Sequence, residues 1–247
     1  IATARIGKLN YSSARLWGSV AFIVSSTLSG LYIAAYTIEA FPALLLVLAA
    51  AVVVSVLPLP DLRPQSKPQR KLAFLELFKL PGFIAVVVVG ALVQASHGAL
   101  YAIGTLHWLN TGISESVIGL LWAQGVVAEV MLFAFGFWLM RKMGVRGLLW
   151  LAVVGGSIRW IVMGFPIDIA GLFGLQMLHA FTFAATHLAM TQYITHKVPD
   201  QLTASAQTFY DALAMGAFMG VTMTLAGIFY NVMEGQVFWL MALLSIA

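Results

Sequence analysis

The chain has 247 residues, of which 61% are hydrophobic and only 9% are charged. An ordinary soluble domain carries about 25% charged residues, so this composition excludes that class and indicates a polytopic membrane protein. Cysteine is absent, which excludes disulfides and thiolate metal sites. The net charge of +4 does not predict a nucleic-acid partner, because the basic residues follow a membrane topology.

Apolar segments follow one another along the whole chain. They lie at about 14–36, 39–57, 82–109, 115–139, 147–165, 168–195, 204–231 and 235–247. The last is shorter than the roughly 20 residues that cross a bilayer as a helix, so we expect it to continue in a longer protein. The chain starts at Ile1 without a recognisable signal peptide, and we expect a fragment that begins in a loop. The predicted fold is therefore an all-α, polytopic membrane helix bundle of about eight spans, incomplete at both ends.

The basic residues predict the orientation of these segments. All of them except Arg159 fall in alternate loops, and the other loops carry only acidic charges. The basic residues in loops are Arg5, Lys8, Arg15, Arg63, Lys67, Arg70, Lys71, Lys79, Arg141, Lys142, Arg146 and Lys197. Because loops rich in Lys and Arg stay in the cytoplasm, we place these loops on the cytoplasmic side of the cell's inner membrane.

One loop, 58–78, differs in composition from the rest of the chain. Its sequence PLPDLRPQSKPQRKLAFLELF is rich in Pro, Lys, Arg and Gln, which predicts an extended cytoplasmic linker. Residues 72–79, at the end of this loop, are expected to form a short helix on the membrane surface. The linker divides residues 1–57, the end of a first helix bundle, from residues 79–247, a second bundle of six spans.

The segment SVIGLLWAQGVVAEVMLFAFGFWL, at 116–139, carries one carboxylate, Glu129, in its interior. An acidic side chain at the centre of a membrane helix costs roughly 2.5 to 3.5 kcal/mol on translocon scales. A sequence tolerates that cost where the group meets a partner or a wet cavity. The candidate partners, Arg159, His179 and His187, each lie inside another apolar segment. We predict that these four residues form a buried proton-coupling cluster.

Polar residues also recur at steps of three or four along the third segment, which places them on one helix face. They are Gln94, His97, Tyr101, Thr105 and Trp108. Two interpretations stay open for such a face, a substrate-binding surface and interhelical hydrogen bonding. Gly216 and Gly220 form a GxxxG pair, which predicts close helix packing. The chain lacks HExxH, GxSxG and Walker motifs, and we expect neither an enzyme nor a cofactor or metal site.

The chain resembles the phenylpropionate-permease-like transporters of the major facilitator superfamily, relatives of lactose permease. The residues Tyr11, Arg15, Trp17, Gly18 and Ser19 match the family's Y-G-x-x-R-L-W-G-S motif at the start of the fifth span, with Ser12 in place of Gly. Further matches follow in order: HGALY from His97, LWAQGVVAEV from Leu121, RW from Arg159, LH from Leu178 and VFWLMAL from Val237. The resemblance covers essentially the whole chain and implies that its segments are spans five to twelve.

The resemblance implies a monomeric secondary transporter in the lipid bilayer that couples a proton to a small organic solute. Glu129, Arg159 and His179 resemble the carboxylate, Arg and His that couple protons in lactose permease, with His187 as a second candidate. We expect an aromatic carboxylate to meet Arg159 and the rings of Tyr101, Trp108 and Trp122. A sugar or nucleoside, bound by Gln94 and His97, is the alternative substrate. A receptor or assembly subunit that transports nothing is the alternative class.

Overall fold

The computed structural model describes the backbone of residues 11–36, 39, 41–58 and 73–247, and the side chains of these residues apart from 11–16 and 73–74. The membrane helices before the linker position are α2 (Tyr11–Tyr36) and α3 (Phe41–Val56). After it come α4 (Ala73–Leu77), α5 (Phe83–Ala95), η2 (Leu100–Gly104), α6 (Thr105–Asn110), α7 (Glu115–Ala134), α8 (Gly136–Met163), α9 (Ile169–Met177), η3 (Ala180–Ala185), α10 (Thr186–Lys197), α11 (Thr203–Asp211), η4 (Ala212–Phe218), α12 (Met219–Met233), η5 (Glu234–Gln236) and α13 (Val237–Ile246).

Within the described residues, six helical stretches are long and apolar enough to cross a membrane. They are Trp17–Tyr36, Phe83–Asn110, Glu115–Ala134, Gly136–Met163, Ile169–Lys197 and Thr203–Ile246, and the last contains both α11–α12 and α13. The shorter α3 is also apolar. Every predicted segment contains a helix, so the prediction of an all-α, multi-pass membrane bundle is confirmed. Most of the predicted linker, at 59–72, lies outside the described residues.

One predicted boundary is wrong. The fourth segment was expected to run to residue 139, but α7 ends at Ala134, and Phe135, with φ −95° and ψ 4°, separates it from α8. Arg141, Lys142 and Arg146, expected in a loop, lie on either side of Gly144, where the backbone leaves the helical conformation and α8 consists of two helices joined at a kink. The helix bends at Gly144, where φ is +65° and ψ −179°, a conformation that glycine adopts without a Cβ clash.

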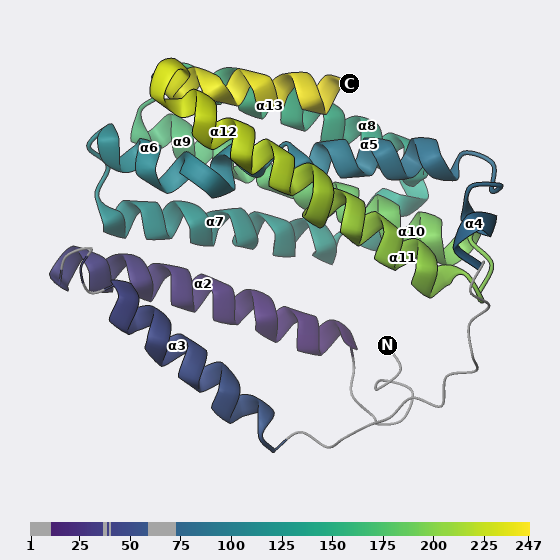
Figure 1. The fold of residues 1–247 in the computed structure, drawn as a ribbon, viewed down its shortest axis with the longest axis horizontal. Helices are drawn as coiled ribbons and strands as arrows, with labels where there is room; N and C mark the ends of the chain where they lie inside the picture. The colour runs from purple at the N-terminus through teal and green to yellow at the C-terminus, as the bar shows by residue number, and fades with distance from the viewer. Residues whose placement is uncertain (1–10, 37–38, 40, 59–72) are drawn as a thin grey trace.

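The helices run back and forth between two ends of the bundle (Figure 1). The short helix α4 and the α10–α11 connection lie at one end, while α6, α9 and the turn from α12 to α13 lie at the other. Lys79 and Lys197 follow α4 and end α10, so these two cations share the first end. This arrangement agrees with the alternation of basic and acidic loops in the sequence.

Helices α2 and α3, which precede the linker, differ in their packing. Helix α2 lies along α7 (Figure 1), and the two approach most closely where a Cβ on Gly30 would lie 2.6 Å from the Glu115 carbonyl oxygen and one on Gly119 would lie 2.7 Å from that of Ser26. Small residues permit this approach between membrane helices. All of α3, which the structure describes in full, is exposed or partly exposed. Its apolar surface suits contact with lipid.

The close packing predicted at Gly216 and Gly220 is not found. No described heavy atom of another element lies within 4 Å of a Cβ built at either position. Close contacts at glycine lie elsewhere in the described residues, such as that between Gly30 of α2 and Gly119 of α7. A GxxxG pattern places two small residues on one helix face, but it does not determine whether another helix covers that face.

Two spans are interrupted near their middle, at the α5–η2 and α9–η3 junctions. Where α5 ends, side chains bond the carbonyl groups that the interrupted helix leaves without their usual partners. The Ser96 hydroxyl donates to Val93 O at 2.6 Å, the His97 ring to Gln94 O at 3.0 Å, and the Thr222 hydroxyl to Ala95 O at 2.9 Å. Backbone groups inside a bilayer need such partners, so these polar side chains make the interruption tolerable.

Candidate functional site

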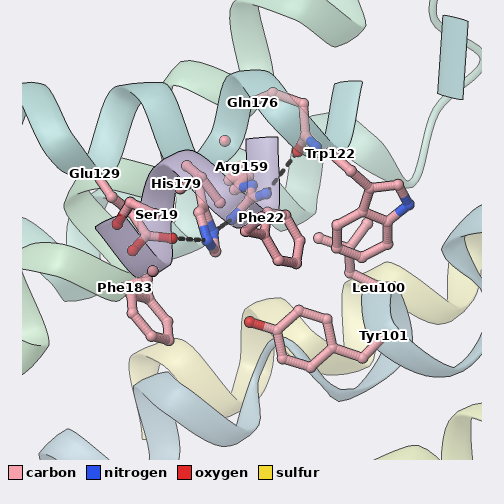
Figure 2. A pocket seen from close by; sticks show the side chains of 13 residues that line it. Ser19, Phe22, Leu100, Tyr101, Trp122, Glu129, Arg159, Gln176, His179 and Phe183 are labelled. Atoms are coloured by element: carbon pink, nitrogen blue, oxygen red, sulfur yellow. Dashed lines mark hydrogen bonds and ion pairs between the residues drawn. The ribbon is translucent and has the colours of Figure 1, made fainter. Parts of the chain in front are cut away.

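A row of hydrogen-bonded polar side chains crosses the interior of the bundle (Figure 2). Glu129 comes from α7, Arg159 from α8, and His179 from the junction of α9 and η3. The His179 Nε2 atom lies 2.8 Å from Glu129 Oε1, and His179 Nδ1 lies 3.0 Å from Arg159 Nη1. The imidazole therefore stands between the carboxylate and the guanidinium. The structure brings together three of the four residues predicted as a buried cluster.

The partners of His179 determine which of its nitrogens carries hydrogen. A guanidinium only donates, so Nδ1 must accept from Arg159. A neutral imidazole has one N–H, which then lies on Nε2 and donates to Glu129 Oε1. A second proton on the ring would set an N–H against the Arg159 N–H and break that hydrogen bond. The single ring of His179 is thus hydrogen-bonded to both the carboxylate and the guanidinium.

Arg159 is fully buried, and all its assigned hydrogen-bond acceptors are neutral. It donates to His179, to the Thr182 hydroxyl at 3.0 Å and to Gln176 Oε1 at 2.6 Å. These bonds use three of its five N–H groups. Its Nε has no hydrogen-bond partner among the described residues. The guanidinium also lies over the Trp160 ring, with the central carbon 4.6 Å from the ring centroid. Arg159 therefore retains donors for an anionic ligand.

The row borders a cavity of about 470 Å³. Figure 2 shows Glu129, His179 and Arg159 along one side in this view, with Tyr101 across the open space. Phe183 lies beside the row, where its ring stacks on that of His179 with centroids 5.3 Å apart. The lining comprises Gly18, Ser19, Phe22, Leu100, Tyr101, Trp122, Gly125, Val126, Glu129, Arg159, Gln176, His179 and Phe183. Tyr101 stacks on Trp122 with ring centroids 6.0 Å apart. The cavity therefore combines one charged wall with several aromatic rings, as in many small-molecule sites.

The predicted substrate-binding residues divide into two groups. Tyr101, Trp122 and Arg159 line the cavity. Gln94, His97 and Trp108 do not; they are buried, with at most 4% of their surface exposed. Trp108 packs edge-on against Trp122, at 6.0 Å between centroids. His97 stacks on Tyr101, at 5.7 Å between centroids. The prediction that these three residues touch substrate remains a prediction.

The remaining predicted residues lie at varying distances from the row. His187 packs against Phe133 and Phe183, with ring centroids 5.9 Å and 6.4 Å away, and is absent from the cavity lining. Gly18 and Ser19 of the helix-start motif line the cavity, whereas Trp17 is 72% exposed. The side chains of the motif's other two members, Tyr11 and Arg15, lie outside the described residues.

Sequence reasoning did not assign Phe22, Gln176 and Thr182 to the site. Gln176 and Thr182 precede and follow His179 by three residues, which places all three on one helix face, and that spacing was available as a signal. Phe22 had no such signal, because its place in the lining depends on how α2 packs against α7. No group of three His, Asp or Glu side chains among the described residues is arranged to hold a metal ion.

A sequence profile described as "MFS_1 like family" matches residues 3–241. The chain belongs to this family. Its relatives in the family include the "Probable 3-phenylpropionic acid transporter" of Escherichia coli (strain K12), which is 34% identical over 96% of this chain and 63% of the relative. The "Uncharacterized transporter YwbF" of Bacillus subtilis (strain 168) is 27% identical over 96% of this chain and 60% of that protein.

The chain spans about three fifths of the length of these curated relatives. No solved structure matches it. The family membership confirms the resemblance found in the sequence and, with the apolar helices, identifies a multi-pass membrane protein of a transporter family. It does not assign a role to any residue, so the roles of the row and of the cavity rest on their geometry.

Proposed function

We propose that this chain forms part of a secondary transporter that carries a small aromatic carboxylate into the cell together with a proton. The observation that carries the proposal is the imidazole of His179, held between Glu129 and Arg159 at 2.8 Å and 3.0 Å. Structural ion pairs usually bring the two charges into direct contact. An imidazole placed between the two charges can gain or lose a proton, and each change alters its hydrogen bond to Glu129 or to Arg159.

A proton can enter this row in two places, with different consequences. On Glu129 it removes the negative charge, and the occluded site then avoids carrying a bare carboxylate through the membrane. On His179 it ends the hydrogen bond from Arg159 and frees an N–H of the guanidinium. Either event changes what Arg159 offers to a ligand, and this dependence of ligand binding on the proton is what symport requires.

An aromatic carboxylate matches both parts of the cavity. Arg159, with its unpartnered Nε, suits a planar carboxylate, which a guanidinium binds with two parallel hydrogen bonds. Tyr101, Trp122 and Phe22 offer rings on which an aromatic group packs. The E. coli relative, named a probable 3-phenylpropionic acid transporter, supports the same substrate class. A sugar or nucleoside has less support, because Gln94 and His97 are buried and absent from the cavity lining.

Counterflow in proteoliposomes tests this proposal. Vesicles with the full-length protein and loaded with 3-phenylpropionate should accumulate labelled 3-phenylpropionate, and sugars or nucleosides should not compete. If only a sugar or a nucleoside shows counterflow, that solute replaces the aromatic carboxylate as the proposed substrate class. If every solute in the screen fails, while the purified protein is folded, the alternative of a receptor or assembly subunit that transports nothing replaces the transporter.

A further inference from the structure

The Thr182 hydroxyl connects Arg159 to a second histidine. Thr182 lies in η3 and is fully buried. Its Oγ1 lies 3.0 Å from Arg159 Nη1 and 3.0 Å from His97 Nε2. The same Arg159 nitrogen bonds His179. One guanidinium nitrogen is therefore shared between His179, which lines the cavity, and Thr182, which is absent from the lining.

The direction of each hydrogen bond in this branch follows from its donors. Arg159 donates to Thr182. The His97 ring donates from Nδ1 to the Gln94 carbonyl at 3.0 Å, so its Nε2, in the neutral ring, accepts the Thr182 hydroxyl hydrogen. The branch runs without a break from the guanidinium to the backbone at the end of α5. It ties Arg159 to the point where the span 83–110 is interrupted.

This branch keeps its hydrogen bonds under conditions in which the bond to His179 is lost. When His179 carries two protons it cannot accept from Arg159, and the guanidinium then retains only Thr182 and Gln176 as acceptors. A buried guanidinium without sufficient acceptors is strongly destabilised. The Thr182 hydroxyl supplies one of the two bonds that remain.

We propose that Thr182 is a positioning residue of the site. Its hydroxyl, hydrogen-bonded to His97, keeps Arg159 in place while the proton is bound at His179. The role of Thr182 in transport rests on the proposed function. The hydrogen bond by which Thr182 positions Arg159 does not require a bound substrate. Among the described residues, the titratable and charged groups that face His179 are Glu129 from α7, Arg159 from α8, His97 from the end of α5 and, across the cavity, Tyr101 from η2.

Thermal unfolding at several pH values tests this role without any ligand. Thr182→Val removes the hydroxyl and keeps the shape of the side chain. We expect it to lower the unfolding midpoint, followed by tryptophan fluorescence of the purified full-length protein, and to do so more at acidic than at alkaline pH. Thr182→Ser restores a hydroxyl and should follow the wild type at every pH.

A matched control is Thr186→Val. The Thr186 hydroxyl is equally buried but donates to the Thr182 carbonyl at 2.7 Å, a bond within the span that involves neither Arg159 nor a histidine. Its loss should lower the midpoint by the same amount at all pH values. If Thr182→Val also lowers the midpoint by a constant amount, or if Thr182→Ser fails to restore it, the positioning role is overturned.

Binding of 3-phenylpropionate to the same preparations separates this inference from the proposed function. We expect Thr182→Val to bind it about tenfold more weakly at acidic pH, the factor that one hydrogen bond to a charged group provides. A wild type with the expected pH-dependent Thr182 effect but no binding or counterflow supports the positioning role and overturns the proposed function. A wild type that binds and transports, with Thr182→Val unchanged at every pH, overturns the positioning role alone.

Discussion

The two interrupted spans, 83–110 and 169–197, carry the same short pattern and use it differently. In each, a Gln is followed by a His three residues later and by an aromatic residue four residues after that: Gln94, His97 and Tyr101 in the first, and Gln176, His179 and Phe183 in the second. Tyr101 and Phe183 both line the cavity, but of the two His only His179 does. His97 is fully buried and bonds its own backbone and Thr182.

The neighbours of each span account for this difference. His179 faces α7 and α8, which supply Glu129 and Arg159, whereas His97 packs edge-on against Trp160 and His179 at 5.3 Å and 5.2 Å between centroids. Spacing along a helix determines which residues share a face. The facing helices determine whether a histidine there contacts a carboxylate or stabilises an interrupted backbone.

The largest effect is expected at the residue that both histidines depend on. Arg159→Ala removes the donor to His179, Thr182 and Gln176. It also removes the guanidinium that we propose binds the substrate carboxylate. A hydrogen bond to a charged group contributes about 1.5–3 kcal/mol, so binding of 3-phenylpropionate and its counterflow should be lost. Arg159→Lys is the control, because it keeps the charge without the planar fork. Wild-type affinity in both variants would contradict the assignment of Arg159 to the site.

A smaller but more selective effect distinguishes the two histidines. His179→Gln should stop substrate-driven proton movement, because the ring that connects Glu129 with Arg159 is gone. His97→Gln should retain it with a lower unfolding midpoint, because an amide can still accept from Thr182. Proton uptake measured with a pH-sensitive dye in vesicles compares the two directly. Equal loss of coupling in both variants would mean that the two spans have equivalent roles.

The α2–α7 contact gives an intermediate effect on stability. Gly119→Leu should push α2 away from α7, because even a Cβ at this position would lie 2.7 Å from the Ser26 carbonyl oxygen. Overpacking of this kind costs about 1–3 kcal/mol. Gly216→Leu is the control, since its Cβ meets no described atom and should change stability by about 0.5 kcal/mol or less. Denaturation of both variants in detergent, with equal losses, would refute the role given to the α2–α7 contact.

The insertion of a reporter into the predicted linker tests the orientation of the chain in the membrane, and we expect it to have no effect on activity. A reporter inserted near Gln69 should read as cytoplasmic, because the basic residues of the predicted linker resist translocation. The second bundle's α4 and the α10–α11 connection would then share that side. A periplasmic signal from the reporter would reverse the orientation inferred from the charges.

The sequence was sufficient for the features that depend on burial in lipid. The lengths of the apolar segments predicted the spans. The free-energy cost of a carboxylate in a membrane helix indicated Glu129 and its partners Arg159 and His179. The sequence was not sufficient for features that depend on helix rotation and contact. It assigned His97 to the substrate-binding face although His97 is absent from the cavity lining, it assigned close packing to Gly216 and Gly220, and it did not place Phe22 in the cavity.

The interruptions of the two spans were also beyond sequence reasoning. Neither Ser96 nor Leu178 is a proline, and the apolar pattern continues through both places. The α5 interruption is stabilised by hydroxyl and imidazole groups, one of them from α12. Such long-range partners become apparent only when the helices are assembled.

The central claim, that the Glu129–His179–Arg159 row couples a proton to substrate, is tested most directly at Glu129. Glu129→Gln imitates the permanently protonated acid in the full-length protein. We predict that vesicles with this variant still exchange 3-phenylpropionate but neither take up protons with it nor accumulate it against a gradient. Accumulation equal to that of the wild type, with the same proton uptake, would contradict the claim and leave the row a structural element.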